Sequence, residues 1–372
     1  MKSIFCPALL FLCLPWTGPA ATRVEEVPEQ GLQPEVSTGP EGTIHLVYLR
    51  GDAKAADVRY TWRKPGEPWQ TSAPVNSPAT KGIAVGSIRG AQVALGANGT
   101  VHVLWNGVSG GEHAPQAPLW YARKKAGDRE FGKPRDLLGD TVALDGGASI
   151  AADAHGKVFV VWHGNLATKE PEEKQRLVFV RTSTDEGDTF GNPEPANRDQ
   201  PGVCACCSLR AFTGPEDGLR IFFRNALTTE SRSMTLLSQK AGGWTTGAIE
   251  PWKIAACPMS SAALTSYQHS QLLGAWETAG QIRAGWISAP GSTPVTVAAS
   301  SAKHPTVAVS PQGRILIAWV EGSGWNRGGS AVWQEFDAKL QPLGPPEKAA
   351  GVPAWGRVAG YAEPKGDFVI LR

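Results

Sequence analysis

Four cysteines in two short segments are the residues of this sequence with the most distinctive chemistry. Cys204, Cys206 and Cys207 form one tight group, and Cys257 is followed two positions later by Met259. Thiolates and a thioether are soft donors, a set that suits Cu(I) and also Zn(II). The first prediction for this cluster is therefore a copper or zinc site. An imidazole could be added to the set by His163 or His269.

The start of the chain predicts export, and in an exported protein the cysteines could form disulfides instead of a metal site. Lys2 precedes an apolar segment at positions 4–16, and small residues at positions 18–21 offer a cleavage site. This order is typical of a secretory signal peptide at residues 1–21 and is too short for a membrane span. Its removal takes away Cys6 and Cys13 and leaves a secreted or periplasmic domain at residues 22–372.

Free thiols in exported proteins tend to oxidise, so disulfides are the second prediction for the cluster. Four cysteines allow three complete pairings. One option is a bridge from the triplet to Cys257, with a second bridge inside the triplet. Metal site and disulfides both remain open at this point.

Composition excludes several classes of protein and favours β-structure. The chain has 372 residues, 41% hydrophobic and 19% charged, with a formal net charge of +2. This balance gives no support for nucleic-acid binding, and no stretch after the signal is long and apolar enough to span a membrane. The 43 Gly, 29 Pro and 14 Trp residues favour many short strands joined by tight turns.

A repeated hairpin runs along the chain and predicts how these strands are arranged. In each copy a strand ends in a polar turn with Gly, and the next strand usually ends in an aromatic residue. The second strands end at positions 48, 105, 162, 224, 276, 319 and 372, which are 43 to 62 residues apart. Two further strands follow most hairpins. Four antiparallel strands in roughly 50 residues make one blade of a β-propeller, so we expect an all-β, single-domain propeller.

One copy of the repeat contains a motif that carries a family resemblance. The segment at positions 183–190 reads Ser-Thr-Asp-Glu-Gly-Asp-Thr-Phe, the pattern of an Asp box. In such a turn the carboxylate accepts loop amides, Gly takes a positive φ and the aromatic residue plugs the blade. The chain therefore resembles the sialidase-like (BNR, Asp-box) β-propellers over essentially all of residues 22–372. The structural Asp-box residues are Ser183, Asp185, Gly187, Thr189 and Phe190.

The sequence supports two alternative numbers of blades. The resemblance implies six blades, because the sialidase family is six-bladed. The hairpin count gives seven, with residues 22–34 supplying an outer strand to the last blade and so closing the ring. Both arrangements stay open.

The topology of a propeller predicts which polar residues share a face. The Asp box is a turn between the third and outer strands, and it marks the face opposite the substrate side of sialidases. Residues just after each second strand, or just before each inner strand, lie on the other face with the cysteines. The ligand-binding candidates on that face are Arg50, Arg89, His163, Arg224, Glu277, Glu321 and Arg357.

Arg224 stands out because it takes the place of the aromatic residue that ends most second strands. By the resemblance it belongs to the arginines that hold a carboxylate, which a guanidinium grips with two hydrogen bonds. The alternative is an arginine paired with a neighbouring acidic residue. Both interpretations remain open.

The catalytic pattern of sialidases is not recognisable. No Arg-Ile-Pro motif occurs near the start, Tyr361 is outside the context of the nucleophile, and the cysteine triplet stands where the family places its base Glu. We therefore assign no catalytic residue and expect an exported ligand-binding or metal-associated module without sialidase activity. One alternative is an exo-acting glycoside hydrolase on acidic glycans. Another is a protein-interaction propeller with structural disulfides. The expected partners are a carbohydrate or another exported protein.

Overall fold

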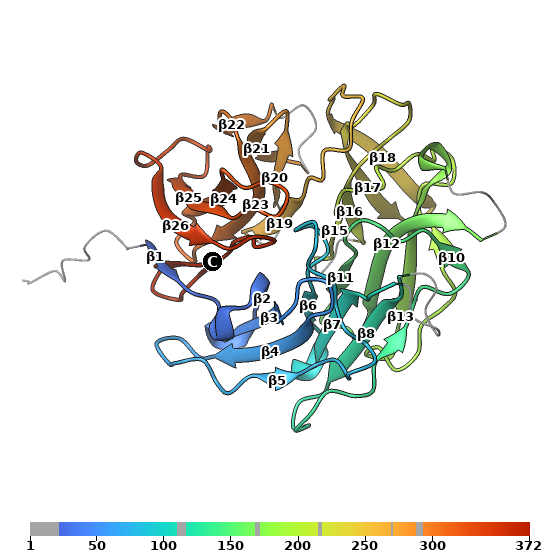
Figure 1. The fold of residues 1–372 in the computed structure, drawn as a ribbon, viewed down its shortest axis with the longest axis horizontal. Helices are drawn as coiled ribbons and strands as arrows, with labels where there is room; N and C mark the ends of the chain where they lie inside the picture. The colour runs from blue at the N-terminus through green and yellow to red at the C-terminus, as the bar shows by residue number, and fades with distance from the viewer. Residues whose placement is uncertain (1–21, 110–116, 168–171, 215–217, 269–270, 288–292) are drawn as a thin grey trace, which may run out of the picture.

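The computed structural model describes residues 22–109, 117–167, 172–214, 218–268, 271–287 and 293–372. These residues form seven small sheets arranged as a β-propeller, as the sequence predicts (Figure 1). The inner strands β2, β6, β11, β15, β19, β23 and β27 lie next to one another in a closed ring. The count of seven hairpins is therefore confirmed, and the six-bladed arrangement implied by the resemblance is wrong for this chain. The predicted signal peptide and His269 lie outside the described residues.

Six sheets take their strands from consecutive segments of the chain, ordered from the inner strand outward. The first two contain β2 (Leu32–Thr38), β3 (Ile44–Arg50), β4 (Asp57–Arg63) and β5 (Ala73–Pro74), then β6 (Gln92–Leu95), β7 (Val101–Asn106), β8 (Leu119–Lys124) and β9 (Arg135–Asp136). The third contains β11 (Ser149–Ala152), β12 (Val158–Leu166), β13 (Leu177–Ser183) and β14 (Glu194–Pro195), and β10 (Thr141–Val142) pairs with the far end of β12.

The next three sheets repeat the same order. They contain β15 (Arg210–Phe212), β16 (Arg220–Arg224), β17 (Met234–Lys240) and β18 (Gly243–Glu250); β19 (Ala262–Tyr267), β20 (Gln271–Thr278), β21 (Gln281–Trp286) and β22 (Val295–Ala298); and β23 (Ala302–Val309), β24 (Ile315–Glu321), β25 (Gly329–Phe336) and β26 (Glu347–Val352). Short 3₁₀ turns lie at Pro28–Gln30, Pro40–Gly42, Ala97–Gly99 and Glu173–Gln175.

The seventh sheet joins the two ends of the chain. It contains β27 (Ala359–Ala362), β28 (Phe368–Leu371) and β1 (Thr22–Glu25), with β1 parallel to β28. Main-chain hydrogen bonds between Val27 and Arg372, and between Arg372 and Glu25, continue this pairing. The expected closing strand near the start of the chain is thus present at residues 22–25.

The repeated hairpin forms because its turn residues accept a left-handed backbone. In the second sheet Asn98 and Gly99 have φ of 54° and 75°, values that Asn and Gly tolerate best. The strand that follows is apolar on both sides because it packs between two neighbouring sheets, and its aromatic residue is fully buried. Four of these second strands contain Trp105, Trp162, Trp276 and Trp319, all at most 1% exposed.

The indole N–H groups of these tryptophans all find acceptors. Trp105 donates to the carbonyl oxygen of Thr80 at 2.9 Å, and Trp162 to the hydroxyl of Thr141 at 3.0 Å. A buried indole gains from packing only if its N–H is paired. The tryptophans of the repeat are therefore packing residues.

The turn at positions 183–190 joins β13 to β14 and is held by its own side chains. The Asp185 carboxylate accepts from the amide of Thr189 at 2.9 Å, from its hydroxyl at 2.6 Å and from the Ser183 hydroxyl at 2.7 Å. The Thr189 hydroxyl, its amide and Ser183 together lower the pKa of Asp185 well below its usual range. Gly187 has φ of 74°, and Phe190 packs against the core between the second and third sheets.

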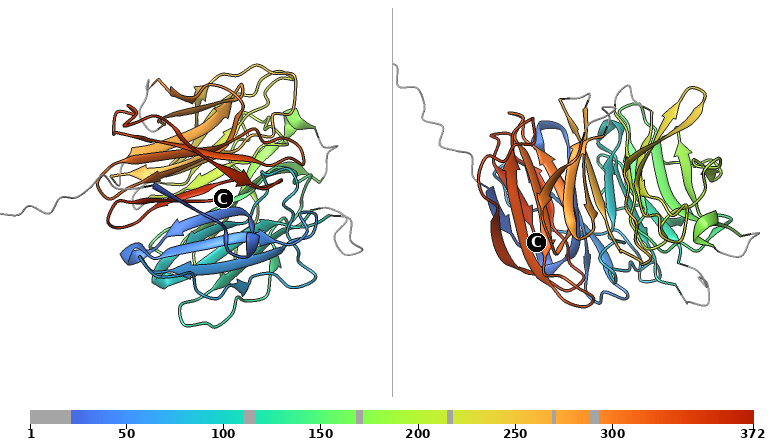
Figure 2. Two further views of the ribbon diagram at one scale, coloured as in Figure 1. Left: turned by 60° about the vertical axis from the view of Figure 1, so that its left-hand side comes forward. Right: turned by 90° about the horizontal axis from the view of Figure 1, so that it is seen from above.

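The strands run between two faces of the propeller, seen from the side in Figure 2. The turn face carries the turns from inner to second strands and the turn at 183–190. The loop face carries the loops that lead into the inner strands. The cysteine triplet lies in the loop between β14 and β15, and Cys257 lies between β18 and β19. Both loops belong to the loop face, as the sequence predicts.

Candidate functional site

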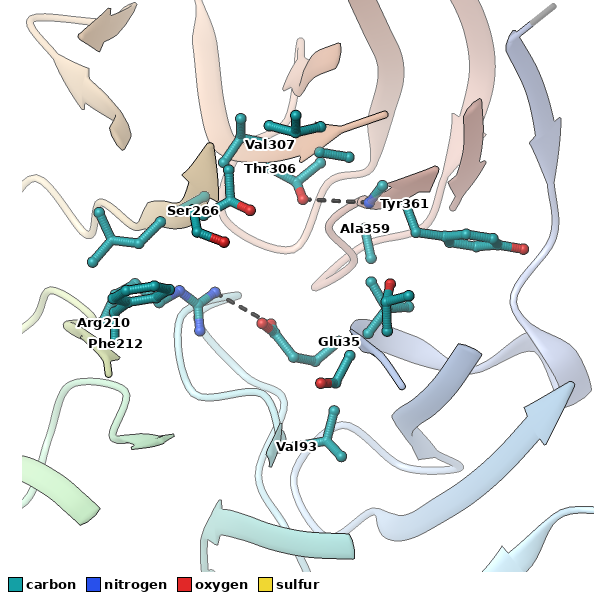
Figure 3. Close-up of a pocket in the computed structure, with 18 of the residues that line it drawn as sticks. Glu35, Val93, Arg210, Phe212, Ser266, Thr306, Val307, Ala359 and Tyr361 are labelled. Carbon is teal, nitrogen blue, oxygen red and sulfur yellow. Dashed lines mark hydrogen bonds and ion pairs between the residues drawn. The ribbon is translucent and has the colours of Figure 1, made fainter. Parts of the chain in front are cut away.

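The seven inner strands surround a central cavity of about 1050 Å³. It extends from the first residues of these strands, near the loop face, to the turns at the turn face. Hydroxyl groups are frequent in its wall, between apolar side chains such as Val93 and Phe212 (Figure 3). The lining Ser and Thr residues are Ser37, Thr38, Ser149, Thr213, Ser261, Thr265, Ser266, Thr306 and Ser310.

A charged group occupies the end of the cavity near the loop face. Glu35 on β2 lies 3.2 Å from Arg210 on β15 (Figure 3). It also lies 2.9 Å from Arg357, which precedes β27. The side-chain carbonyl oxygen of Gln92 on β6 accepts a hydrogen bond from Arg210. Arg210 also donates to the carbonyl oxygen of Ala262 at 2.7 Å. Four inner strands therefore meet around this group.

The charges of this group do not cancel within it. One carboxylate faces two guanidinium groups, and Arg357 is only 3% exposed. The pKa of Arg357 is lowered to about 10, mainly by burial; Glu35 opposes this shift and Arg210 contributes to it. Its Nε and Nη1 atoms have no hydrogen-bond partner among the described residues. Buried N–H groups without partners are costly. Arg357 and Arg210 both line the cavity, so this end of it is positively charged.

The four sulfur atoms gather beside the cavity, at the loop face. Cys206 and Cys257 form a disulfide, and Cys204 and Cys207 are thiols. The Sγ atom of Cys204 lies 3.2 Å from that of Cys207 and 3.7 Å from that of Cys206. The three cysteines of the triplet are buried, whereas Cys257 is exposed. Met259 packs against this cluster.

Arg224 holds the cluster together and is not open to a ligand. It is 1% exposed and donates from Nε to the Ser260 hydroxyl at 2.9 Å, and from Nη1 and Nη2 to the carbonyl oxygens of Arg232 and Glu277. Its guanidinium carbon lies 4.7 Å from the centre of the Trp252 ring. Each of its three nitrogens donates to a protein atom, and Arg224 does not line the cavity, so it is not placed to grip a ligand there.

The two thiols have different electrostatic surroundings. Burial raises the pKa of Cys207, but contact with Cys204, the charge of Arg224 and the Ser260 hydroxyl together lower it below its ordinary value. Contact with Cys207, followed by burial, raises the pKa of Cys204. If either thiol is ionised, it is therefore Cys207.

His163 positions the triplet with both of its ring nitrogens. Its Nε2 atom donates to the carbonyl oxygen of Cys207 at 2.9 Å, and Arg176 donates to its Nδ1 atom at 3.4 Å. Burial first, and the charge of Arg176 second, lower the pKa of His163 to about 3, so the ring is neutral. It therefore acts on the cluster through the main chain and offers no free nitrogen for a metal.

The remaining candidates do not converge on one site. Arg50 pairs with Glu29 at 3.5 Å and is half-exposed, and Arg89 pairs with Asp145. Glu321 lies 3.1 Å from Lys348. Arg357 is the one predicted residue in the wall of the cavity, whereas His163, Arg224 and Glu277 border the sulfur atoms.

Glu277 is buried and lies 3.5 Å from Lys303. Burial raises its pKa to about 7. Its Oε2 atom has no partner among the described residues.

Sequence reasoning missed Glu35, Arg210 and Gln92. The signal that could have found them is a charged or amide residue at the start of a short inner strand, where the side chain faces the axis. Tyr361 lines the cavity through its strand, but its ring points away from it, and its hydroxyl accepts from Arg63 (Figure 3). It is not placed as a nucleophile.

Fold and site together define a sialidase-like β-propeller with a polar central cavity and a cysteine cluster. No protein-family model matches the sequence, and no curated protein is similar to it in sequence. Among solved structures, a protein of unknown function from Dyadobacter fermentans matches at 13% identity and a TM-score of 0.57, covering 86% of this chain and 93% of that one.

Two further matches have printed functions. The Hadza microbial sialidase Hz136 matches at 13% identity and a TM-score of 0.53, over 78% of this chain and 63% of the sialidase. The Aleuria aurantia lectin, a six-bladed propeller that recognises fucose, matches at 11% identity and a TM-score of 0.51, over 86% of this chain and 94% of the lectin. These likenesses concern the fold. In the part of the chain that the structure describes, no helix is long and apolar enough to cross a membrane.

Proposed function

We propose that this protein is an exported propeller that binds an acidic carbohydrate in its central cavity without cleaving it. The observation that carries the proposal is the buried Arg357, whose Nε and Nη1 lack partners beside Glu35 and Arg210. A sugar carboxylate would accept from these donors, and such charge-assisted hydrogen bonds are strong. The Ser and Thr side chains in the wall of the cavity suit the hydroxyl groups of a sugar.

Carbohydrate as the ligand class is supported by the likeness of the fold to a sialidase and a fucose-binding lectin. Export is supported by the pattern of residues 1–21. The size of the cavity, about 1050 Å³, leaves room for more than one sugar ring.

The absence of cleavage follows from the positions of the acidic groups. Among the described residues, the acidic side chains that line the cavity are Glu35 and Glu41. Glu35 lies on β2 near the loop face, whereas Glu41 lies in the 3₁₀ turn Pro40–Gly42 at the turn face, so the two side chains belong to opposite ends of the cavity. Most glycosidases place two carboxyl groups about 5–9.5 Å apart across the scissile bond, and sialidases use a Tyr nucleophile instead of one of them. The Tyr361 ring points away from the cavity. Glu35 is in addition occupied by two arginines, so neither residue is placed as half of a catalytic pair.

Replacing Arg357 with Met tests the proposal. We expect the variant to bind a sugar acid such as glucuronate or N-acetylneuraminate about 10- to 100-fold more weakly, because it loses charged donors worth about 1.5–3 kcal/mol. Calorimetric titration measures the affinity, and a fluorogenic sialoside measures cleavage, which we expect from neither protein.

Arg50→Met is the matched control, because Arg50 is half-exposed and lies outside the cavity. It should leave the affinity unchanged. A second variant, Arg357→Lys, keeps the charge but loses the planar fork and should bind with intermediate affinity. Equal affinity of wild type and folded Arg357→Met for the acid would contradict the proposal, as would sialoside turnover by the wild type.

A further inference from the structure

The sulfur cluster at the loop face has no part in the proposed carbohydrate site. None of its cysteines lines the cavity. The Sγ atoms of Cys204, Cys206 and Cys207 all lie within 4.8 Å of one another, and all three residues are buried. We infer that these three cysteines bind one Cu(I) ion when the Cys206–Cys257 disulfide is reduced.

The spacing of the sulfur atoms is close to what a three-coordinate ion requires. With metal–sulfur bonds of about 2.3 Å, three sulfurs around one ion lie about 4 Å apart. The structure already places Cys204 Sγ at 3.2 Å from Cys207 and 3.7 Å from Cys206. Shifts of less than about 1 Å would therefore open the triplet around an ion.

The charges around the triplet match those of such a complex. Cu(I) with three thiolates carries two negative charges. The buried guanidinium groups of Arg176 and Arg232 act on Cys204, and that of Arg224 acts on Cys207. Glu173 offsets one of these charges, since it lies 2.8 Å from Arg232. Glu277 also acts on Cys207 and is paired with Lys303 at 3.5 Å. The positive groups named here outnumber the acidic ones, and a buried ionic complex is stable only when it is compensated in this way.

Main-chain and side-chain contacts hold the triplet in place without a metal. The amide of Ala205 donates to Glu173 at 3.0 Å, and His163 donates to the carbonyl oxygen of Cys207. The Cys207 sulfur lies 3.3 Å from the Ser260 hydroxyl. These partners come from the third sheet and from the loop before the fifth, so the ligand loop is supported from both sides, as metal sites require.

Cu(I) is favoured over Zn(II) by the number and burial of the sulfurs. Structural zinc sites close with four ligands, whereas the fourth sulfur here belongs to the exposed Cys257. Soft thiolate and thioether donors favour Cu(I), and the thioether of Met259 packs against the same cluster.

Loading requires a thiol reductant, and the reaction balances. A thiolate of an external dithiol attacks the exposed Cys257 sulfur, the Cys206 thiolate leaves, and the second thiol of the dithiol resolves the mixed disulfide. Two electrons and two protons thus pass to the two cysteines while the dithiol is oxidised to a disulfide. Binding of Cu(I) then forms three copper–sulfur bonds and releases the protons of the three cysteines.

A set of cysteine variants tests the site without oxygen. The mature protein is mixed with Cu(I), passed through a desalting column and assayed for copper by elemental analysis. We expect about one equivalent for reduced wild type and almost none for the oxidised protein. Cys257→Ser cannot form the disulfide but keeps the triplet, so it should bind about one equivalent with no reductant. Cys207→Ser, the matched control within the triplet, should retain almost no copper.

Thermal unfolding and sugar titration accompany each variant, so a misfolded variant is recognised and loss of the carbohydrate site is scored separately. Copper absent from a folded, reduced Cys257→Ser protein would overturn the inference. So would a native protein in which mass spectrometry finds two disulfides that reform whenever copper is offered. Preferred retention of zinc by all four cysteines would overturn the assignment to a three-thiolate Cu(I) site.

Discussion

Replacing Glu35 with Gln is expected to strengthen binding of an acidic sugar by about 10- to 100-fold. Glu35 is the one carboxylate between Arg210 and Arg357, at 3.2 and 2.9 Å. Its removal leaves two cations facing the ligand, and a unit charge a few ångströms away is worth several kcal/mol at an effective dielectric constant of about 20. Competing water and relaxation reduce this gain to the range given.

The sign of this effect makes the prediction specific. The same substitution should lower the melting temperature, because two guanidinium groups then lie together without a counter-charge. Calorimetric titration measures the affinity for glucuronate and for its neutral methyl ester. The substitution should raise the affinity for the acid and leave that for the ester unchanged. Weaker binding of the acid by folded Glu35→Gln would contradict the role given to the arginines.

Replacing Arg224 with Met should destabilise the protein by about 3–5 kcal/mol. Arg224 donates to the Ser260 hydroxyl and to the carbonyl oxygens of Arg232 and Glu277, and these acceptors would be left buried without a donor. It also joins the β16 strand to the loop before β19, so its loss should loosen the loops around the cysteines. We therefore expect the thiols of the native protein to react with an alkylating reagent at least about tenfold faster.

Denaturant unfolding and the rate of alkylation measure the two effects. Arg50→Met is again the matched control, because Arg50 is half-exposed and makes one ion pair at 3.5 Å. Its loss should cost at most about 0.5 kcal/mol. An unchanged stability in Arg224→Met would show that the Arg224 guanidinium is not the support that the structure assigns to it.

The sequence predicts the propeller because each blade is a local unit. The hairpin that ends in Trp105 needs the left-handed turn at Asn98 and Gly99, and both features are readable within a few residues. Repetition of this unit predicts the sheets and places the loops on one face or the other. The number of blades cannot be predicted from one local unit, because the last sheet takes β1 from the opposite end of the chain. The seven hairpins give that number, and the family resemblance does not.

The charged end of the cavity could not be predicted in the same way. Glu35 and Arg357 are 322 residues apart and meet only because the ring closes. Arg210 lies 175 residues from Glu35 and reaches it across the axis. Each residue alone is an ordinary charged residue in or next to an inner strand. Their convergence depends on the curvature of the whole ring, which no local pattern records.

The cysteine cluster is predictable from the sequence only in part. The topology of the propeller places two loops of neighbouring sheets together, and the structure joins these loops through the Cys206–Cys257 disulfide. The same reasoning predicted neither the burial of Arg224 nor its three hydrogen bonds. The sequence leaves open whether Arg224 binds a ligand or pairs with a neighbouring acidic residue, whereas the folded chain uses it to hold carbonyl oxygens.

The structure of the protein crystallised with a sugar acid tests the central claim most directly. We expect one carboxylate in the central cavity, with its oxygens within hydrogen-bond distance of Nε or Nη1 of Arg357 and with Arg210 close by. The hydroxyl groups of the sugar should contact the Ser and Thr side chains of the inner strands. A sugar bound elsewhere on the propeller, or a cavity in which Arg357 stays without an anion at saturating concentrations of the acid, would contradict the account.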